Sequence, residues 1–191
     1  MLTLINKSIS ATLLISLGNF ALLKLGLPLG AIIFSFGLIG ICYMDLNLFT
    51  GKCGFLIQNK IKIKDLLLIL LVNLISGYLI GLLYSTLDIE IYNNAIEKVA
   101  SWSPNLPYFI KSILCGIIMY ISVYIYKKGT PIGIIFGIPL FILCGFQHCI
   151  ANIITLGIAR NVAFTNICSI ILCIIGNFLG SVLMWYISKC D

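Results

Sequence analysis

The chain has 191 residues, of which 61% are hydrophobic and 9% are charged, and its mean hydropathy is +1.14. A soluble domain carries about 25% charged and about 45–50% apolar residues, so this composition excludes an ordinary soluble enzyme or binding domain and predicts an integral membrane protein. The formal net charge of +6 is then a signal for orientation in a lipid bilayer, and no nucleic-acid partner is expected.

Six apolar segments are long enough to cross a bilayer as helices, which takes roughly 17–25 residues each. They cover about residues 8–27, 29–50, 66–87, 106–126, 132–157 and 165–187. The first resembles a signal peptide but lacks a small-residue cleavage site, so we interpret it as the first span. The only long connection, residues 88–105, is expected to be a loop. The sequence therefore predicts an all-α integral membrane protein in which residues 1–191 form a single transmembrane domain.

Basic residues in the connections predict the orientation of these spans. One side of a six-span arrangement carries eight of them: Lys7, Lys52, Lys60, Lys62, Lys64, Lys127, Lys128 and Lys189. The other side carries four, Lys24, Lys98, Lys111 and Arg160, together with acidic residues. Because basic connections stay in the cytoplasm, we expect a multi-pass protein of the plasma (inner) membrane with both termini cytoplasmic. The closely spaced lysines 60, 62 and 64 also suit anionic lipid, although orientation alone explains them.

The eight cysteines give no indication of a metal site or of a disulfide framework. None forms a C-x-x-C pair, and only Cys149 adjoins the single histidine, His148. Most lie in apolar segments, where a free cysteine behaves as a small hydrophobic residue. We therefore expect neither a metal nor a cofactor.

The two halves of the chain resemble each other. FGL at 36–38 recurs as FGI at 136–138, and NLISG at 73–77 recurs as NFLGS at 177–181. These matches predict one repeat of three spans over about residues 1–100 and a second over about 101–191. Because three is odd, the second copy enters the membrane from the opposite face. An inverted repeat of this kind predicts a binding or conduction site near the midplane.

Polar residues interrupt the second and fifth spans near their ends, in MDLNLFTGKCGF and FILCGFQHCIANI. Backbone at membrane depth can leave a helix only where protein or a water-filled cavity satisfies its polar groups. We therefore expect both helices to be broken, with Thr50–Gly51 and Asn152 at the breaks. Each break leaves a helix N-terminus near the centre, and such an end favours anions.

The run GFQHCIANI, residues 145–153, holds the only histidine of the chain. A lone histidine among apolar residues of a soluble protein is more often structural than functional. Within a membrane span, however, ionisable and strongly polar groups are costly and usually line a pathway. Gln147 and Asn152 have a second explanation, because such side chains also form hydrogen bonds between helices. We interpret His148, Gln147 and Asn152 as candidates for the centre of a pore.

At these residues the chain resembles the formate/nitrite transporter family. The family has a G-F-E-H-S-x-A-N-M run in its fifth span, where this chain has GFQHCIANI. The end of its second span resembles Asn47-Leu48-Phe49-Thr50-Gly51, preceded here by FSFGL at 34–38. The G-N-x-x-G of its sixth span matches residues 176–180. The resemblance covers nearly the whole chain.

This resemblance implies an aquaporin-like bundle of six transmembrane helices with broken helices 2 and 5, assembled as a homopentamer with one pore per protomer. It implies a channel for small monovalent weak-acid anions such as formate, nitrite, lactate or hydrosulfide, and no enzymatic activity. By position, His148 is the central histidine, Thr50 faces it and Asn152 holds the break in helix 5. The apolar constrictions would consist of Phe34, Leu38, Leu48, Phe49 and Phe141.

Three positions depart from the family pattern. Gln147 stands in place of the glutamate that precedes the histidine. The asparagine of the fourth span falls on Gly116. The lysine of the vestibule falls on Ala100, and Lys98 lies close enough to replace it.

A weak acid can cross an apolar constriction by taking up a proton, since a bare anion faces a desolvation cost of order 20 kcal/mol in a low-dielectric medium. His148 is a candidate proton donor because histidine exchanges protons near neutral pH. The uncharged Gln147 does not favour an imidazolium, so we expect a neutral His148 and a proton from water. One alternative is a channel for ammonia, urea, water or ammonium, and another is a non-conducting structural or sensory membrane protein. A membrane enzyme is disfavoured, because no nucleophile–base pair adjoins His148.

Overall fold

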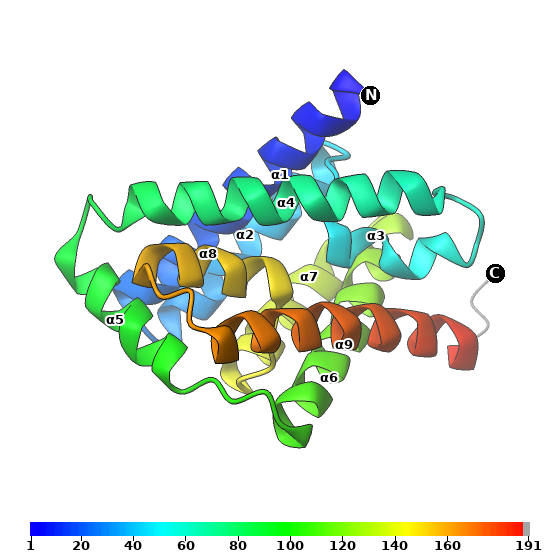
Figure 1. The fold of residues 1–191 in the computed structure, drawn as a ribbon. Helices are drawn as coiled ribbons and strands as arrows, with labels where there is room; N and C mark the ends of the chain where they lie inside the picture. The colour runs from blue at the N-terminus through cyan, green and yellow to red at the C-terminus, as the bar shows by residue number, and fades with distance from the viewer. Residues whose placement is uncertain (189–191) are drawn as a thin grey trace.

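The computed structural model describes residues 1–188, and these residues form helices joined by short connections (Figure 1). The helices are α1 (Leu2–Leu25), α2 (Leu29–Tyr43), α3 (Phe49–Leu56), α4 (Ile63–Tyr84), α5 (Ile89–Ala100), α6 (Leu106–Lys127), α7 (Ile132–Leu143), α8 (Cys149–Ala159) and α9 (Phe164–Ser188). The predicted all-helical class is confirmed. Lys189, one of the lysines used to predict the orientation, lies outside the described residues.

Four helices, α1, α4, α6 and α9, are long and apolar enough to cross a membrane. They correspond to the first, third, fourth and sixth predicted spans. The first begins earlier than predicted, at Leu2 rather than residue 8. Lys7 therefore lies within α1, where its ammonium group pairs with Asp45 at 3.2 Å.

The second and fifth predicted spans are each interrupted, and each continues past its predicted end. Helix α2 is followed by α3, which ends at Leu56 rather than at residue 50, and α7 is followed by α8, which ends at Ala159 rather than at residue 157. The interruptions cover residues 44–48 and 144–148, so they lie a few residues before the predicted positions. Asp45 and Gly145 take left-handed backbone conformations, with φ of 47° and 67°, which end α2 and α7. Thr50 and Asn152 consequently lie in the first turns of α3 and α8 instead of at the breaks.

The expectation of a loop over residues 88–105 is wrong, because this connection contains helix α5. The carboxylate of Asp88 caps the helix by accepting hydrogen bonds from the backbone N–H groups of Glu90 and Ile91, at 2.9 and 3.2 Å. Ile91, Ala95 and Val99, spaced one helical turn apart, form its buried face. Both signals were present in the sequence.

The same helix contacts recur in the two halves of the bundle. Helix α1 packs against α2 and α4, as α6 packs against α7 and α9. Each short helix that follows a break packs against the long helix of the other half, α3 against α9 and α8 against α4 (Figure 1). The two halves therefore interlock around the breaks.

Candidate transport site

The extended segment before α3 is held by Asn73, a fully buried residue of α4. Its side-chain oxygen accepts a hydrogen bond from Phe49 N at 2.9 Å. Its amide nitrogen donates to the carbonyl oxygens of Asn47 and Ser8, at 3.2 and 2.9 Å. One side chain thus satisfies both an N–H and a C=O group that the break removes from helical pairing.

Asn177 of α9 does the same for the segment before α8. Its oxygen accepts from Cys149 N at 2.9 Å, and its nitrogen donates to the carbonyl oxygens of Gln147 and Ser112, both at 2.8 Å. Sequence reasoning noted both asparagines, in the repeat NLISG/NFLGS and in the G-N-x-x-G motif, but assigned a role to neither.

His148 immediately precedes α8 and uses both ring nitrogens. Nδ1 accepts a hydrogen bond from Ala151 N at 3.1 Å, which caps the helix. Nε2 lies 2.8 Å from the hydroxyl oxygen of Thr50, so the structure brings these two predicted pore-centre residues together. Because Nδ1 accepts, it carries no proton, and the proton of the neutral ring resides on Nε2, which donates to Thr50.

Asn152 and Gln147 form a polar group beside His148. The side-chain nitrogen of Asn152 donates to the side-chain oxygen of Gln147 and to the hydroxyl of Tyr108, both at 2.9 Å. Gln147 in turn donates to the carbonyl oxygen of Gly145 at 3.0 Å. Tyr108, on α6, was missed by sequence reasoning, since nothing in the sequence places it near the break.

Two separate cavities flank the Thr50–His148 hydrogen bond. The smaller, of about 80 Å³, is lined by His148, Gln147, Asn152, Phe34, Phe141 and Lys98, with six further residues. The larger, of about 210 Å³, is lined by Leu38, Leu48, Gly51, Lys52 and Lys127, with six others. Helix α8 contributes to the wall of the first cavity and α3 to the wall of the second, and the hydrogen bond joins the starts of these two helices.

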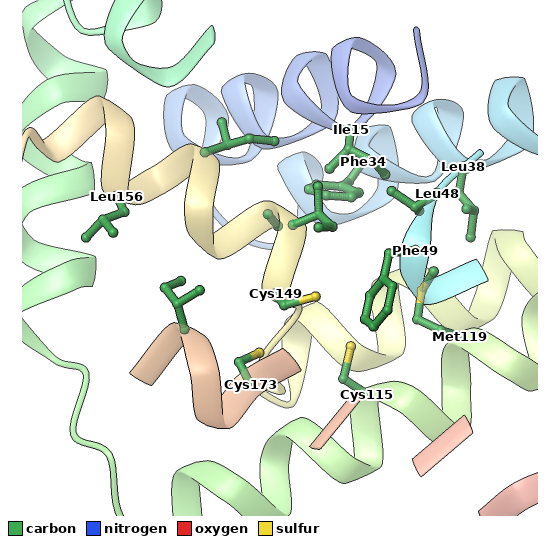
Figure 2. Packing of buried hydrophobic residues seen from close by; sticks show 14 of the residues in the cluster. Ile15, Phe34, Leu38, Leu48, Phe49, Cys115, Met119, Cys149, Leu156 and Cys173 are labelled. Carbon is green, nitrogen blue, oxygen red and sulfur yellow. The ribbon is translucent and has the colours of Figure 1, made fainter. Parts of the chain in front are cut away.

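Most of the predicted constriction residues are buried at these cavities. The ring of Phe141 stacks on His148 at 5.8 Å between centroids and meets Phe34 edge-on at 6.2 Å. Leu38 and Leu48 are each 1% exposed and face the other cavity. Phe49 lines neither cavity, and its ring points towards Cys115 and Met119 (Figure 2).

Comparison with known proteins gives the chain its family. The profile of the formate/nitrite transporter family matches residues 1–189. The chain belongs to this family. The family and the two structural relatives described next are transporters and channels, which confirms that the chain is not an enzyme and, with the apolar helices, that it is a membrane protein.

Two solved structures resemble the whole fold. An FNT family ion channel has a TM-score of 0.81 and 20% identity, covering 100% of this chain and 91% of its own. A pentameric formate channel with formate bound has a TM-score of 0.76 and 17% identity, covering 98% and 93%. A comparison with curated protein sequences finds no match.

Gly116, the position on which the resemblance placed the asparagine of the fourth span, packs against α9 in this chain. A Cβ atom at this position would overlap the backbone of Asn177, and the hydroxyl of Ser181 donates to Gly116 O at 3.0 Å. Gly116 lines neither cavity. Gly116 therefore allows the close approach of α6 and α9.

Lys98 lines the cavity that contains His148. Its ammonium group is therefore a cation in the wall of that cavity. Lys98 is half-buried on α5, and this burial lowers the pKa of its ammonium group to about 8. The helical geometry of α5 is what directs Lys98 towards the cavity.

Replacing Asn177 with leucine should destabilise the fold by removing the partners of Cys149 N–H and Gln147 C=O. Each buried group left unpaired costs about 1–3 kcal/mol. Asn166→Leu, also on α9, is the matched control, because the described side-chain hydrogen bond of Asn166 is a long one, 3.5 Å to the carbonyl oxygen of Asn161 in the connection before α9. We expect thermal unfolding in detergent to show a clearly larger drop in Tm for Asn177→Leu. Equal drops would contradict the role of Asn177.

Proposed function

We propose that the chain is a channel for small monovalent weak-acid anions, of which formate and nitrite are the first candidates. The observation that carries the proposal is the Thr50–His148 hydrogen bond between two cavities, with buried phenylalanine and leucine residues on either side and Lys98 in the outer wall. Membership of the family supports the substrate class, as does the relative that holds formate.

The proposed protomer crosses the bilayer six times, with α2–α3 and α7–α8 as its two broken crossings. Residues 1–100 and 101–191 form the inverted repeats of an aquaporin-like bundle, and five copies assemble as in the pentameric relative. The end of the bundle that carries Lys52, Lys60, Lys62 and Lys127 faces the cytoplasm, since basic connections stay on that side. Both termini then lie in the cytoplasm, and the protein resides in the plasma membrane.

Transport proceeds by neutralisation of the anion at the edge of the apolar region. The Lys98 ammonium group attracts the anion into its cavity, because a cation in a low-dielectric wall raises the local concentration of counter-ions. The anion then takes a proton and passes Phe34 and Phe141 as the neutral acid. Crossing as the bare anion would incur the Born cost of order 20 kcal/mol.

His148 remains neutral during this passage and acts as a hydrogen-bond donor. Protonation of Nδ1 would place its proton against Ala151 N–H, so the ring would lose the hydrogen bond that caps α8. The uncharged Gln147 offers no compensation. Water in the cavity is therefore the source of the proton, and the His148 Nε2–H and Thr50 hydroxyl offer a polar contact to the passing acid.

The function is tested by stopped-flow flux measurements in proteoliposomes at two pH values. We expect at least one of formate, nitrite, lactate and hydrosulfide to permeate, and to do so faster at the lower pH, because the neutral acid is more abundant there. Empty liposomes provide the control for direct diffusion of the acid. Permeation by urea or ammonium alone would contradict the proposal and support a channel for neutral or ammonium-type solutes instead.

His148→Asn separates a donor role from proton transfer by the ring. Asparagine is a good N-cap residue, so the variant keeps an acceptor for the first turn of α8 and should assemble. If water supplies the proton, acid-driven flux should stay within a few-fold of wild type. Complete loss of flux from a correctly assembled variant would show that the imidazole itself carries the proton.

The role of Lys98 predicts a pH dependence that arginine removes. With a pKa of about 8, Lys98 is charged at pH 6.5 and mostly neutral at pH 9, whereas arginine is charged at both values. Exchange of labelled formate at equal pH on both sides should be the same for wild type and Lys98→Arg at pH 6.5. At pH 9 the variant should be faster, on the order of two- to ten-fold.

The fraction of formate that is protonated depends on pH but not on the protein. Comparing the variants with wild type at the same pH therefore isolates the effect of the charge at position 98. Lys98→Gln is the control, and it should be slow at pH 6.5 and match the wild type at pH 9. If the ratios of the formate exchange rates among wild type, Lys98→Arg and Lys98→Gln are the same at both pH values, the ammonium group of Lys98 does not attract the anion.

A further inference from the structure

A further cavity with lysines in its wall lies at the lysine-rich end of the bundle, next to the 210 Å³ cavity of the transport site. It has a volume of about 400 Å³ and is formed by the ends of α1, α3, α4 and α6. Four lysines line it: Lys52, Lys60, Lys62 and Lys127. Its other walls include the apolar side chains of Leu4, Ile61 and Ile69. We refer to it as the lysine groove.

The positive charge in the lysine groove is poorly compensated by the protein. Among the described residues, Lys60, Lys62 and Lys127 form no ion pair, although Asp65 also lines the groove. Two of the ammonium groups converge on one buried ring, with Lys127 at 3.4 Å and Lys60 at 5.9 Å from the centroid of Phe55. Like charges gathered in this way repel each other, and a bound anion would relieve the repulsion.

The backbone adds to this preference for an anion. Helix α4 begins beside the groove at Ile63, and although Asp65 lies in its first turn, no side chain caps its N-terminus. The first N–H groups of a helix attract phosphate in particular, because several donors point outwards along the dipole. Lysines and a free helix N-terminus together match the several acceptor oxygens of a phosphate group.

We propose that the lysine groove binds a phosphate group, supplied either by the headgroup of an anionic phospholipid or by a free phosphate anion. The site also regulates transport, a consequence that rests on the proposed function. Lys52 and Lys127 line both the groove and the 210 Å³ cavity. A phosphate bound between them offsets their charge, so it weakens the attraction of the substrate anion into that cavity.

The binding experiment uses the full chain in a nonionic detergent. Short-chain phosphatidic acid and inorganic phosphate are titrated separately, with the phosphatidylcholine of the same chain length as the neutral lipid, and bound ligand is counted by native mass spectrometry. The test variant is Lys60→Gln with Lys62→Gln. The matched control is Lys64→Gln with Lys128→Gln, which removes the same charge from exposed lysines that do not line the groove.

We expect wild type and the control variant to bind phosphatidic acid, inorganic phosphate or both, and the groove variant to bind at least about tenfold more weakly. Binding of the lipid alone identifies a membrane source, and binding of inorganic phosphate alone identifies a soluble source. The site is overturned if wild type binds neither ligand, or if the two variants weaken equally, since general surface charge then explains the binding.

Flux measurements test the regulatory consequence separately. In neutral liposomes, the bound phosphate source should reduce weak-acid flux several-fold in wild type and in the control variant, and leave the groove variant unchanged. Equal flux with and without the ligand overturns the regulation but not the site. A protein that binds phosphate and passes no weak acid contradicts the proposed function instead, and the regulation with it.

Discussion

The architecture depends on satisfying backbone groups where two helices stop inside an apolar bundle. A bilayer offers no water to such groups, so the protein must supply their partners. Asn73 and Asn177 do this with one side chain per break, each pairing an N–H and a C=O of the extended segment and a carbonyl of a neighbouring long helix. These bonds also fix the residues that begin α3 and α8, and so they set the positions of Thr50 and His148. The backbone of the site is thus held by long helices on both sides.

The two breaks have matching backbones but different chemistry. Leu48 precedes α3 and provides no side-chain cap, whereas His148 at the corresponding place caps α8 through Nδ1. The polar contribution of the first break comes from Thr50, and it meets the imidazole of the second at 2.8 Å. The polar contact that joins the two breaks is thus this single hydrogen bond. Leu38 and Leu48 line the cavity on one side of it, and Phe34 and Phe141 line the cavity on the other. In the proposed function, a neutral acid would exchange hydrogen bonds there, while a bare ion would lose more hydration than this one polar pair returns.

Much of this could be predicted from the sequence, because it depends on local composition. The apolar segments gave the long helices, and the polar residues in MDLNLFTGKCGF and FILCGFQHCIANI indicated interrupted ones. The exact breaks depend on left-handed turns at Asp45 and Gly145, of which only the glycine is a usual sign. Helix α5 was missed although Asp88 and the Ile91–Ala95–Val99 spacing indicate it. The partnership of Asn152 with Tyr108 and the direction of the Phe49 ring depend on how distant helices pack, which no local pattern specifies.

The placement of charge suits the proposed passage of an anion. A cation inside the apolar region would hold an anion too firmly, and conduction requires binding that is weak enough to release. The lysines accordingly lie in the walls of the cavities rather than at the Thr50–His148 pair. On one side Lys98 is half-buried, so its charge is conditional on pH near 8. On the other side, the carboxylate of Asp45 pairs with both Lys7 and Lys52 at 3.2 Å. Its negative charge reduces the positive electrostatic potential that Lys52 produces in the 210 Å³ cavity. In the proposed channel, attraction of the anion at both ends is therefore limited by the protein itself, by burial of the lysine at one end and by ion pairing at the other.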